Sequence, residues 1–351
     1  YNSLMIDNYE HFITRNIKAF YKRRLFSPIV YLVLLLLSWL ILPMHSMLVP
    51  QTVSNGVSFA NIYKSTDRYV KLSFNELNFT GYTSEKRGAT EGYFYYGEYC
   101  NELVIVLLSP QTCEEGLPTI KNIQVTGKMV KRQHSYSQLL SDLAKDLSWT
   151  TEGISGQLPN YFFSEPDYHM PSTIFMFAAF FGTGAYALIC LILYLLYIKF
   201  PFLSPACQNL MVFGNPIRML EEAEEELATL PQLATEDMFI TEHYFILTSP
   251  YGNAIVPIRE ILWIYKYSTL HKFLWYHFSI SYTLHITANK HMYIHCPKNT
   301  KSDIDGIIDY LAEANHDILV GFNEENRLKV QAVQGKPLHI EKLKAFLHRK
   351  I

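Results

Sequence analysis

Two long apolar runs divide the chain. Residues 172–198 contain no ionisable side chain apart from one cysteine and several tyrosines, and residues 27–48 form a second apolar run. A hydrocarbon core about 30 Å thick requires roughly 20 apolar residues of helix. A buried helix of a soluble protein is seldom apolar on every face for so long. Both runs are therefore predicted to be transmembrane helices, with Pro43 near the far end of the first, where a helix can end.

Residues 1–26 precede the first run and have the pattern of an amphipathic helix. Apolar residues recur at spacings of three and four, and basic residues gather towards the end. Such a helix can lie on a membrane surface or pack on a neighbouring folded domain, and the pattern leaves both open. The apolar positions are Ile6, Tyr9, Ile13, Ile17 and Phe20.

Residues 50–170, between the two runs, alternate in polarity as β-strands do. From Tyr136 the period changes to that of a helix, with Leu139, Leu140, Leu143 and Leu147 on one face. About five short strands commonly close as a Greek-key barrel of the OB type. We therefore expect a small OB-like β-barrel domain with one helix. The expected strands are 69–74, 79–83, 92–96, 102–108 and 123–130.

After the second run, residues 200–234 are predicted to form a linker and an acidic helix. Met219, Leu220, Ala223, Leu227 and Leu230 form its apolar face. Clustered carboxylates can bind a hard cation, but such sites need convergent ligands from a shaped loop. The pattern favours a solvated acidic face. The acidic residues are Glu221, Glu222, Glu224, Glu225 and Glu226.

Residues 235–351 are predicted to form a second β-rich domain with a closing helix over 302–315 and a final helix over 339–348. In the hairpin around Ala288–Lys290, apolar residues face the core, while His285, His291 and His295 face the other way. With His291 opposite Thr287, the histidines do not converge, so no metal site is expected. The expected strands are 238–247, 252–257, 261–267, 279–287 and 291–296.

Charge gives an orientation for the two spans. Five basic residues precede the first span, whereas no Lys or Arg lies between it and Lys64 or between Lys145 and the second span. The positive-inside rule places both termini in the cytoplasm and residues 50–170 outside. We therefore expect a two-pass protein of the cell membrane. The near balance of 30 basic and 32 acidic residues gives no reason to expect nucleic acid as a partner.

The five cysteines are distributed in agreement with this orientation. Cys100 and Cys113 fall in the external segment, where they can form a disulfide across the apolar segment 103–108. The remaining cysteines lie in the second span or inside, where thiols stay reduced. A Cys100–Cys113 disulfide is therefore predicted.

The stretch KYSTLHKFLWYH is predicted to be a basic and aromatic loop. Lys266, His271, Lys272 and Trp275 in it could contact anionic lipid headgroups or a partner. Packing of the loop against the N-terminal helix is the alternative.

Small residues lie four apart on adjacent ridges of the second span, where another helix can approach closely. We predict that this face packs against the first span or a second copy of the chain. The residues are Ala178, Ala179, Gly182, Thr183 and Ala187.

The segment ITEHYFILTSPYGNAIVPIREILWIYKY resembles bacterial pleckstrin-homology-like (PH-like) domains, in which a strand pair ends in a proline before an "EI-W-I" strand. With the segments LNFTGY, GYFYYGEYC, LLSPQTCEEGLPTI and FFSEPDY, the chain is similar to an uncharacterised family of two-span membrane proteins from Gram-positive bacteria. That resemblance implies no reaction and no catalytic residue.

Catalytic motifs are absent from the sequence: it has no Gly-x-Ser-x-Gly elbow, His-Glu-x-x-His, phosphate-binding glycine loop or Cys-x-x-Cys. We therefore expect no cofactor and no enzyme activity. The expected function is a two-pass membrane scaffold, adaptor or sensor that links an external ligand or partner to a cytoplasmic one, as a complex with a protein partner or a homo-oligomer. The alternative is an accessory subunit of a membrane transporter or envelope enzyme.

Overall fold

The structure, a computed structural model, describes residues 11–42, 44–53, 56–65, 68–131, 134–146, 160–168, 170–229, 231–273 and 276–335. Two compact units make up the chain: residues 31–186, and residues up to 30 together with those from 187 on. The predicted final helix over 339–348 lies outside the described residues. We call residues 51–168 the intervening domain and residues 201–335 the C-terminal domain.

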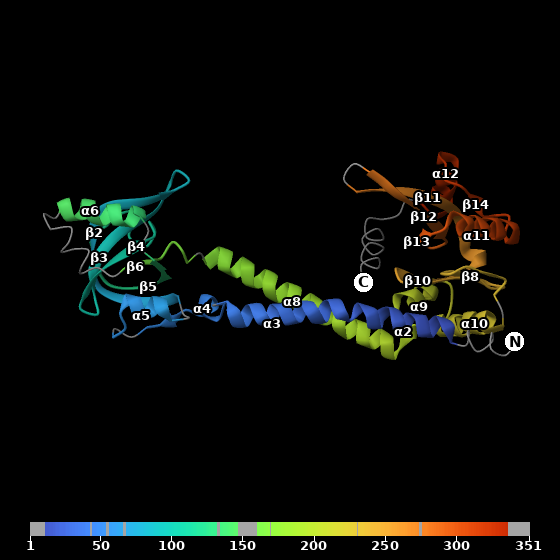
Figure 1. The fold of residues 1–351 in the computed structure, drawn as a ribbon, viewed down its shortest axis with the longest axis horizontal. Helices are drawn as coiled ribbons and strands as arrows, with labels where there is room; N and C mark the ends of the chain where they lie inside the picture. The colour runs from blue at the N-terminus through green and yellow to red at the C-terminus, as the bar shows by residue number, and fades with distance from the viewer. Residues whose placement is uncertain are drawn as a thin grey trace. The chain divides into compact units, whose positions relative to one another are not determined.

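Two helices are long and apolar enough to cross a membrane, Phe12–Ile41 and Pro171–Lys199. The first comprises α2 (Phe12–Arg24) and α3 (Phe26–Ile41), and the second is α8 (Met170–Lys199) (Figure 1). Only 6% and 17% of their most apolar segments are buried. A core helix of a soluble domain would be mostly covered, so this exposure fits helices that face lipid. The first apolar run ends earlier than predicted, because a separate short helix, α4 (Met44–Leu48), follows α3.

Within residues 31–186, α3 and α8 pack through aromatic and small residues. The indole of Trp39 contacts Phe177, Phe180 and Phe181, with ring centroids 5.8–6.2 Å apart. A Cβ atom added to Gly184 would lie 3.2 Å from the side chain of Leu35. The absence of a side chain at Gly184 therefore lets the helices approach closely.

The intervening domain is built on one six-stranded sheet whose pairing closes on itself. Strand β2 pairs with both β3 and β5, while β6 pairs with both β4 and β5. The pairings thus run β2–β3–β4–β6–β5 and return to β2. The elements are β1 (Gln51–Thr52), α5 (Phe59–Lys64), β2 (Tyr69–Lys86), β3 (Ala89–Tyr99), β4 (Glu102–Leu108), β5 (Thr119–Lys131), α6 (His134–Asp146) and β6 (Tyr161–Ser164).

Three glycines permit the close strand crossings of this sheet. A Cβ atom at Gly92, Gly97 or Gly127 would lie 2.5–2.6 Å from a backbone oxygen of another strand. Any larger residue there would force strands apart. The predicted helix is present as α6, and its Leu140 and Leu143 pack with Ile105 on the sheet, whose inner core is filled by residues such as Leu72, Tyr95 and Phe163.

The C-terminal domain contains two four-stranded sheets, of order β10-β9-β8-β7 and β13-β12-β11-β14. A single core between them includes Phe245, Ile264 and Leu284, and α11 covers it with Ile304, Ile307 and Leu311, as predicted. The elements are α10 (Pro216–Thr229), β7 (Leu233–Ala234), β8 (Met238–Ile240), β9 (Tyr244–Ser249), β10 (Gly252–Pro257), β11 (Ile261–Phe273), β12 (Tyr276–Ala288), β13 (Met292–Asn299), α11 (Lys301–Ala314), β14 (Leu319–Val320) and α12 (Glu324–Gln334), with η1 (Pro201–Leu203), α9 (Pro205–Gln208), η2 (Asn209–Val212) and η3 (Ile258–Glu260) as short helical turns.

Two predictions for this domain were wrong, and one helix was missed. The expected strand 238–247 is a hairpin, because Thr241 bonds to the backbone of Tyr244 and turns the chain between β8 and β9. The expected loop after Tyr267 is instead paired strand, since β11 continues to Phe273 opposite β12. Helix α12 was not predicted; Asn323 caps it by accepting the backbone N–H of Asn326.

Candidate functional site

Helix α10 is the element on which the candidate site is built. Its Met219, Leu220, Ala223 and Leu227 are buried, as the apolar pattern predicted. The glutamates are not uniformly solvated, however. Glu221, Glu222 and Glu225 are exposed, Glu226 is half-buried, and Glu224 is only 8% exposed. The expectation of one solvated acidic face is therefore corrected for Glu224 and Glu226.

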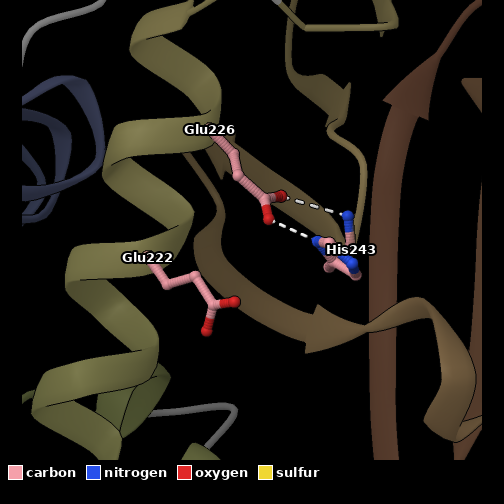
Figure 2. A group of neighbouring side chains, drawn as sticks. All are labelled: Glu222, Glu226 and His243. Carbon is pink, nitrogen blue, oxygen red and sulfur yellow. Dashed lines mark hydrogen bonds and ion pairs between the residues drawn. The ribbon is translucent and has the colours of Figure 1, made fainter.

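Glu222, Glu226 and His243 form what we call the glutamate–histidine cluster. The two glutamates are one helical turn apart on α10, and His243 lies in the turn between β8 and β9 (Figure 2). One ligand atom from each residue lies within 4.8 Å of the others. Figure 2 shows both carboxylates on the side of α10 that faces this turn. Residues 17 or more apart in the chain thus meet at one place.

Glu226 is the centre of the hydrogen bonding. Its carboxylate accepts hydrogen bonds from the hydroxyl of Thr241 at 2.7 Å and from the backbone N–H of His243 at 3.0 Å. A carboxylate oxygen also lies 2.5 Å from Nδ1 of His243. Partial burial alone would raise the pKa of Glu226, but these hydrogen bonds outweigh it and hold the pKa below its ordinary value. The side-chain hydrogen bond between Glu226 and His243 raises the pKa of His243, and the negative charges of Glu242 and Glu222 add to this shift.

Glu222 completes the cluster by accepting the hydroxyl of Tyr244 at 2.9 Å. Burial and this nearby carboxylate raise the pKa of Tyr244, so the phenol stays protonated as a donor. Two carboxylates and an imidazole are a ligand set that Zn²⁺ accepts. A cation bound here would have to replace the contact between Glu226 and His243. In the structure, the cluster ties α10 to the β8–β9 turn.

Glu224, on the same helix, caps α2. Its carboxylate oxygens accept the backbone N–H groups of Ile13 at 3.3 Å and Thr14 at 2.6 Å. The first N–H groups of a helix have no partner inside it, and a negative charge there is stabilised by the helix dipole. The residue before α2, His11, gives no side-chain cap. Glu224 therefore performs from α10 the capping that the His11 side chain does not provide.

One core joins α2, the end of α8 and the C-terminal domain. Ile13 and Ile17 of α2 are almost fully buried in it, together with Tyr194 of α8 and Leu227 of α10. The rings of Tyr21 and Tyr197 lie 4.9 Å apart in the same core. Of the two alternatives for the N-terminal helix, packing on the folded domain is therefore the one observed. The other members of this core are Phe20, Tyr21, Cys190, Cys207, Leu210, Met219, Leu220, Ala223, Phe239, Tyr244, Ile246 and Ile255.

The residues predicted to contact lipid or a partner lie in or beside strand β11. Lys266 is bonded to Asp305 of α11, so its charge is already neutralised within the domain. His271 Nε2 lies 2.7 Å from the hydroxyl of Ser281 on β12. Lys272 is exposed, and Trp275 lies outside the described residues. Lys266, His271 and Lys272 thus lie in a paired strand and not in an exposed loop.

The predicted register of the histidine hairpin was wrong. His285 pairs directly with His295, and Thr287 pairs with Tyr293. Lys290 and His291 both adopt left-handed backbone conformations, which places the turn later than expected. The ring of His285 lies 4.3 Å from that of His295 and stacks on Tyr265 at 5.0 Å. The two histidines thus belong to an aromatic cluster on the outer face of the sheet.

The small residues of the second span are divided between two faces of α8. Ala187 is 5% exposed, whereas Ala178, Ala179, Gly182 and Thr183 are exposed. Among the described residues, a Cβ atom at Gly182 would have no neighbour within 4 Å. The glycine of α8 that contacts α3 is therefore Gly184 and not Gly182. Packing of the Gly182 face against a second copy stays a prediction.

Cys100 and Cys113 are both free in the structure, so the predicted disulfide is not formed there. Cys113 is buried, and its thiol lies 3.3 Å from the backbone oxygen of Ser109. The turn 109–117 thus directs this sulfur into the domain core, and Cys100, in the turn between β3 and β4, is half-buried against the same core.

Sequence reasoning missed the role of Glu224, although a signal existed. Position 224 is four residues after Leu220 and three before Leu227, so helical spacing places it on the buried stripe. An ionisable residue at such a position requires a partner. The contact of Glu226 with His243 carries no comparable signal, because it depends on the turn after β8.

A family model described as Domain of unknown function (DUF6709) matches residues 214–328. The match runs from just before α10 into α12 and thus includes the whole glutamate–histidine cluster, but it covers about a third of the chain. Comparisons with curated proteins and with solved structures give no match.

Proposed function

We propose that the protein is a non-enzymatic two-pass membrane scaffold or sensor, in which the C-terminal domain is clamped to the ends of both spans. The observation that carries this proposal is the shared core of α2, α8 and α10, with Glu224 capping α2. A domain on a free linker would not follow movements of the spans. A domain with which they share a core follows any shift or rotation of the helices, as in interface helix shifts of known switches.

The orientation and domain types belong to this proposal. Basic residues before the first span favour cytoplasmic termini and an external intervening domain. Closed pairing of β2 through β6 supports an OB-like barrel that binds an external ligand. Two sheets followed by α11 support a PH-like domain that docks a cytoplasmic partner.

An accessory subunit of a transporter or envelope enzyme is the second candidate. Exposed apolar side chains on the hairpin of β11 and β12 favour a protein partner for either function. Tyr267, Leu270 and Ile280 are 42–57% exposed on β11 and β12, and Phe322 beside them is 56% exposed. Such side chains are typical of the centre of a protein interface.

Affinity purification of the full chain from its native membrane tests the proposal. Wild type is compared with Ile280→Ser and, as a control, with Ser279→Ala on the same strand. We expect a partner that is retained by the control and lost from Ile280→Ser. A stoichiometric transporter or enzyme would establish the accessory role instead. Reproducible turnover by the purified protein, abolished by one polar substitution, would contradict a non-enzymatic function.

A further inference from the structure

Tyrosine and basic side chains form a band on the intervening domain beside the ends of the two candidate spans. We call this band the tyrosine–basic rim. The hydroxyl of Tyr168, two residues before α8, donates to the backbone oxygen of Met47 in α4 at 3.1 Å. The ring of Tyr168 lies 6.1 Å from that of Tyr69, where β2 begins. The rim comprises Tyr63, Arg68, Tyr69, Lys128, Tyr161 and Tyr168.

The two cations of the rim lie over tyrosine rings. Arg68 is 4.8 Å from the ring centroid of Tyr63, and Lys128 Nζ is 5.6 Å from that of Tyr69. Tyr63 in turn stacks on Tyr161 at 4.3 Å. Arg68 is exposed, and Lys128 and the tyrosines are half-buried. The rings therefore hold the two positive charges in place at the surface, with Arg68 the more accessible of the two.

Apolar side chains next to the rim mark the boundary of the spans. Leu42 is 53% exposed, and Leu48 and Val49 are 44% and 57% exposed. Tyrosine is enriched at the interface between hydrocarbon and water, and basic side chains there attract anionic headgroups. A soluble acidic partner would compete with a bilayer that the spans themselves bring to this place.

We propose that the tyrosine–basic rim seats the intervening domain on anionic phospholipid headgroups of the leaflet in which α3 and α8 end beside it. Arg68 and Lys128 bind the headgroup phosphates, while the tyrosines lie at the level of the headgroups. The proposal requires that the two helices cross a bilayer. It does not depend on the clamped C-terminal domain, so the two proposals can fail separately.

Hydrogen exchange of the full chain in nanodiscs tests this contact. The protein is placed in discs of phosphatidylcholine alone and in discs with added phosphatidylglycerol. Amides of residues 57–65, 68–72 and 126–131 are followed, and those of β3 and β4 report whether the domain stays folded. We expect the rim amides to exchange roughly five-fold to 30-fold more slowly in the anionic discs, the range that attraction of one or both basic side chains supplies.

Matched variants assign this effect to the rim. Arg68→Gln with Lys128→Gln should abolish the difference between the two lipids, while Lys128→Arg should retain it. The control, Arg87→Gln with Lys121→Gln, removes two exposed charges away from the rim, one in the turn after β2 and one near the start of β5, and should retain the difference. Equal exchange of wild type in both lipids, or an equal loss in rim and control variants, would overturn the proposal. Equal protection by free phosphate added to phosphatidylcholine discs would also overturn it.

Discussion

At the scale of residues, the contact between Glu226 and His243 makes the stability of the C-terminal domain depend on pH. The raised pKa of His243 contributes stability that is present below its ordinary value of 6.5 and is lost as pH rises through the raised pKa. The lowered pKa of Glu226 contributes stability above its ordinary value of 4.5, lost as pH falls through the lowered pKa. The pair is therefore strongest between these two limits.

Replacing His243 with Ala should remove the upper pH limit of this stabilisation. Because His243 is largely exposed, the pair is worth no more than about 0.5–1 kcal/mol. We expect the melting temperature of wild type to fall between about pH 6 and pH 9. This fall should exceed that of His243→Ala over the same range by about 1–3 °C. Thermal unfolding of the full chain in detergent measures this difference. The exposed His316→Ala serves as control, and equal pH dependence of all three proteins would exclude the pair as its cause.

Gly127 is the residue at which the sheet of the intervening domain is most tightly closed. An alanine Cβ there would lie 2.5 Å from the backbone oxygen of Ser164. Forcing β5 and β6 apart should destabilise the domain by about 1–3 kcal/mol or more. Gly56→Ala, with no atom within 4 Å of its Cβ, is the control. Chemical denaturation of both variants measures the effect, and unchanged stability of Gly127→Ala would contradict the observed strand pairing.

Sequence pattern predicted residues at this scale only where a local period determines them. The buried faces of α6, α10 and α11 follow from helical spacing, and Glu224 could have been recognised in the same way. The register of His285 with His295 could not be predicted in this way. It depends on left-handed conformations at Lys290 and His291, and neither position is a glycine.

At the scale of elements, Glu224 links α10 to α2. Replacing it with Ala leaves one buried and one partly buried N–H group at the start of α2 without their acceptor, which costs about 1–3 kcal/mol. We expect amides 13–17 to exchange faster in Glu224→Ala, while those of β9 and β10 keep their rates. Glu225→Ala, on the exposed face of the same helix, is the matched control. If both variants exchange like wild type, Glu224 does not hold α2.

The two glycines of α8 allow the helix pair to be tested in the same way. Gly184→Leu places a side chain against Leu35 and should separate α3 from α8, whereas a Cβ atom at Gly182 has no neighbour within 4 Å among the described residues. Crosslinking within the chain between α3 and α8 should fall only in Gly184→Leu. A loss of crosslinking between chains in Gly182→Leu would instead identify this face as a contact between copies. If crosslinking between α3 and α8 fell in Gly182→Leu and not in Gly184→Leu, the observed packing would be contradicted.

Elements were predictable where apolar periods are long. The second candidate span and strands β4 and β10 lie where the sequence places them, whereas the helix of the first span ends at Ile41 and not at Leu48. The β8–β9 hairpin was read as one strand, since Thr241 makes its turn without Gly or Pro. Strand β11 continues through the expected loop, because its pairing with β12 extends to Phe273 despite the basic residues there.

At the scale of the whole molecule, the central feature is how the C-terminal domain is attached. Sequence composition predicted two spans and β-rich domains. It could not predict that α2, α8 and α10 share one core, because Glu224 and Ile13 are 211 residues apart in the chain. Attachment through a core couples the domain to both candidate spans, and this supports the proposed scaffold or sensor.

The distance between α2 and the far side of the C-terminal domain tests this attachment most directly. Spin labels on non-natural amino acids are placed at the exposed positions Arg15 and Glu313 of the full chain in nanodiscs, and double electron–electron resonance measures their separation. A clamped domain predicts one narrow distance distribution, which broadens in Glu224→Ala and stays narrow in Glu225→Ala. A broad distribution in wild type would show a domain that moves independently of the spans and would contradict the account.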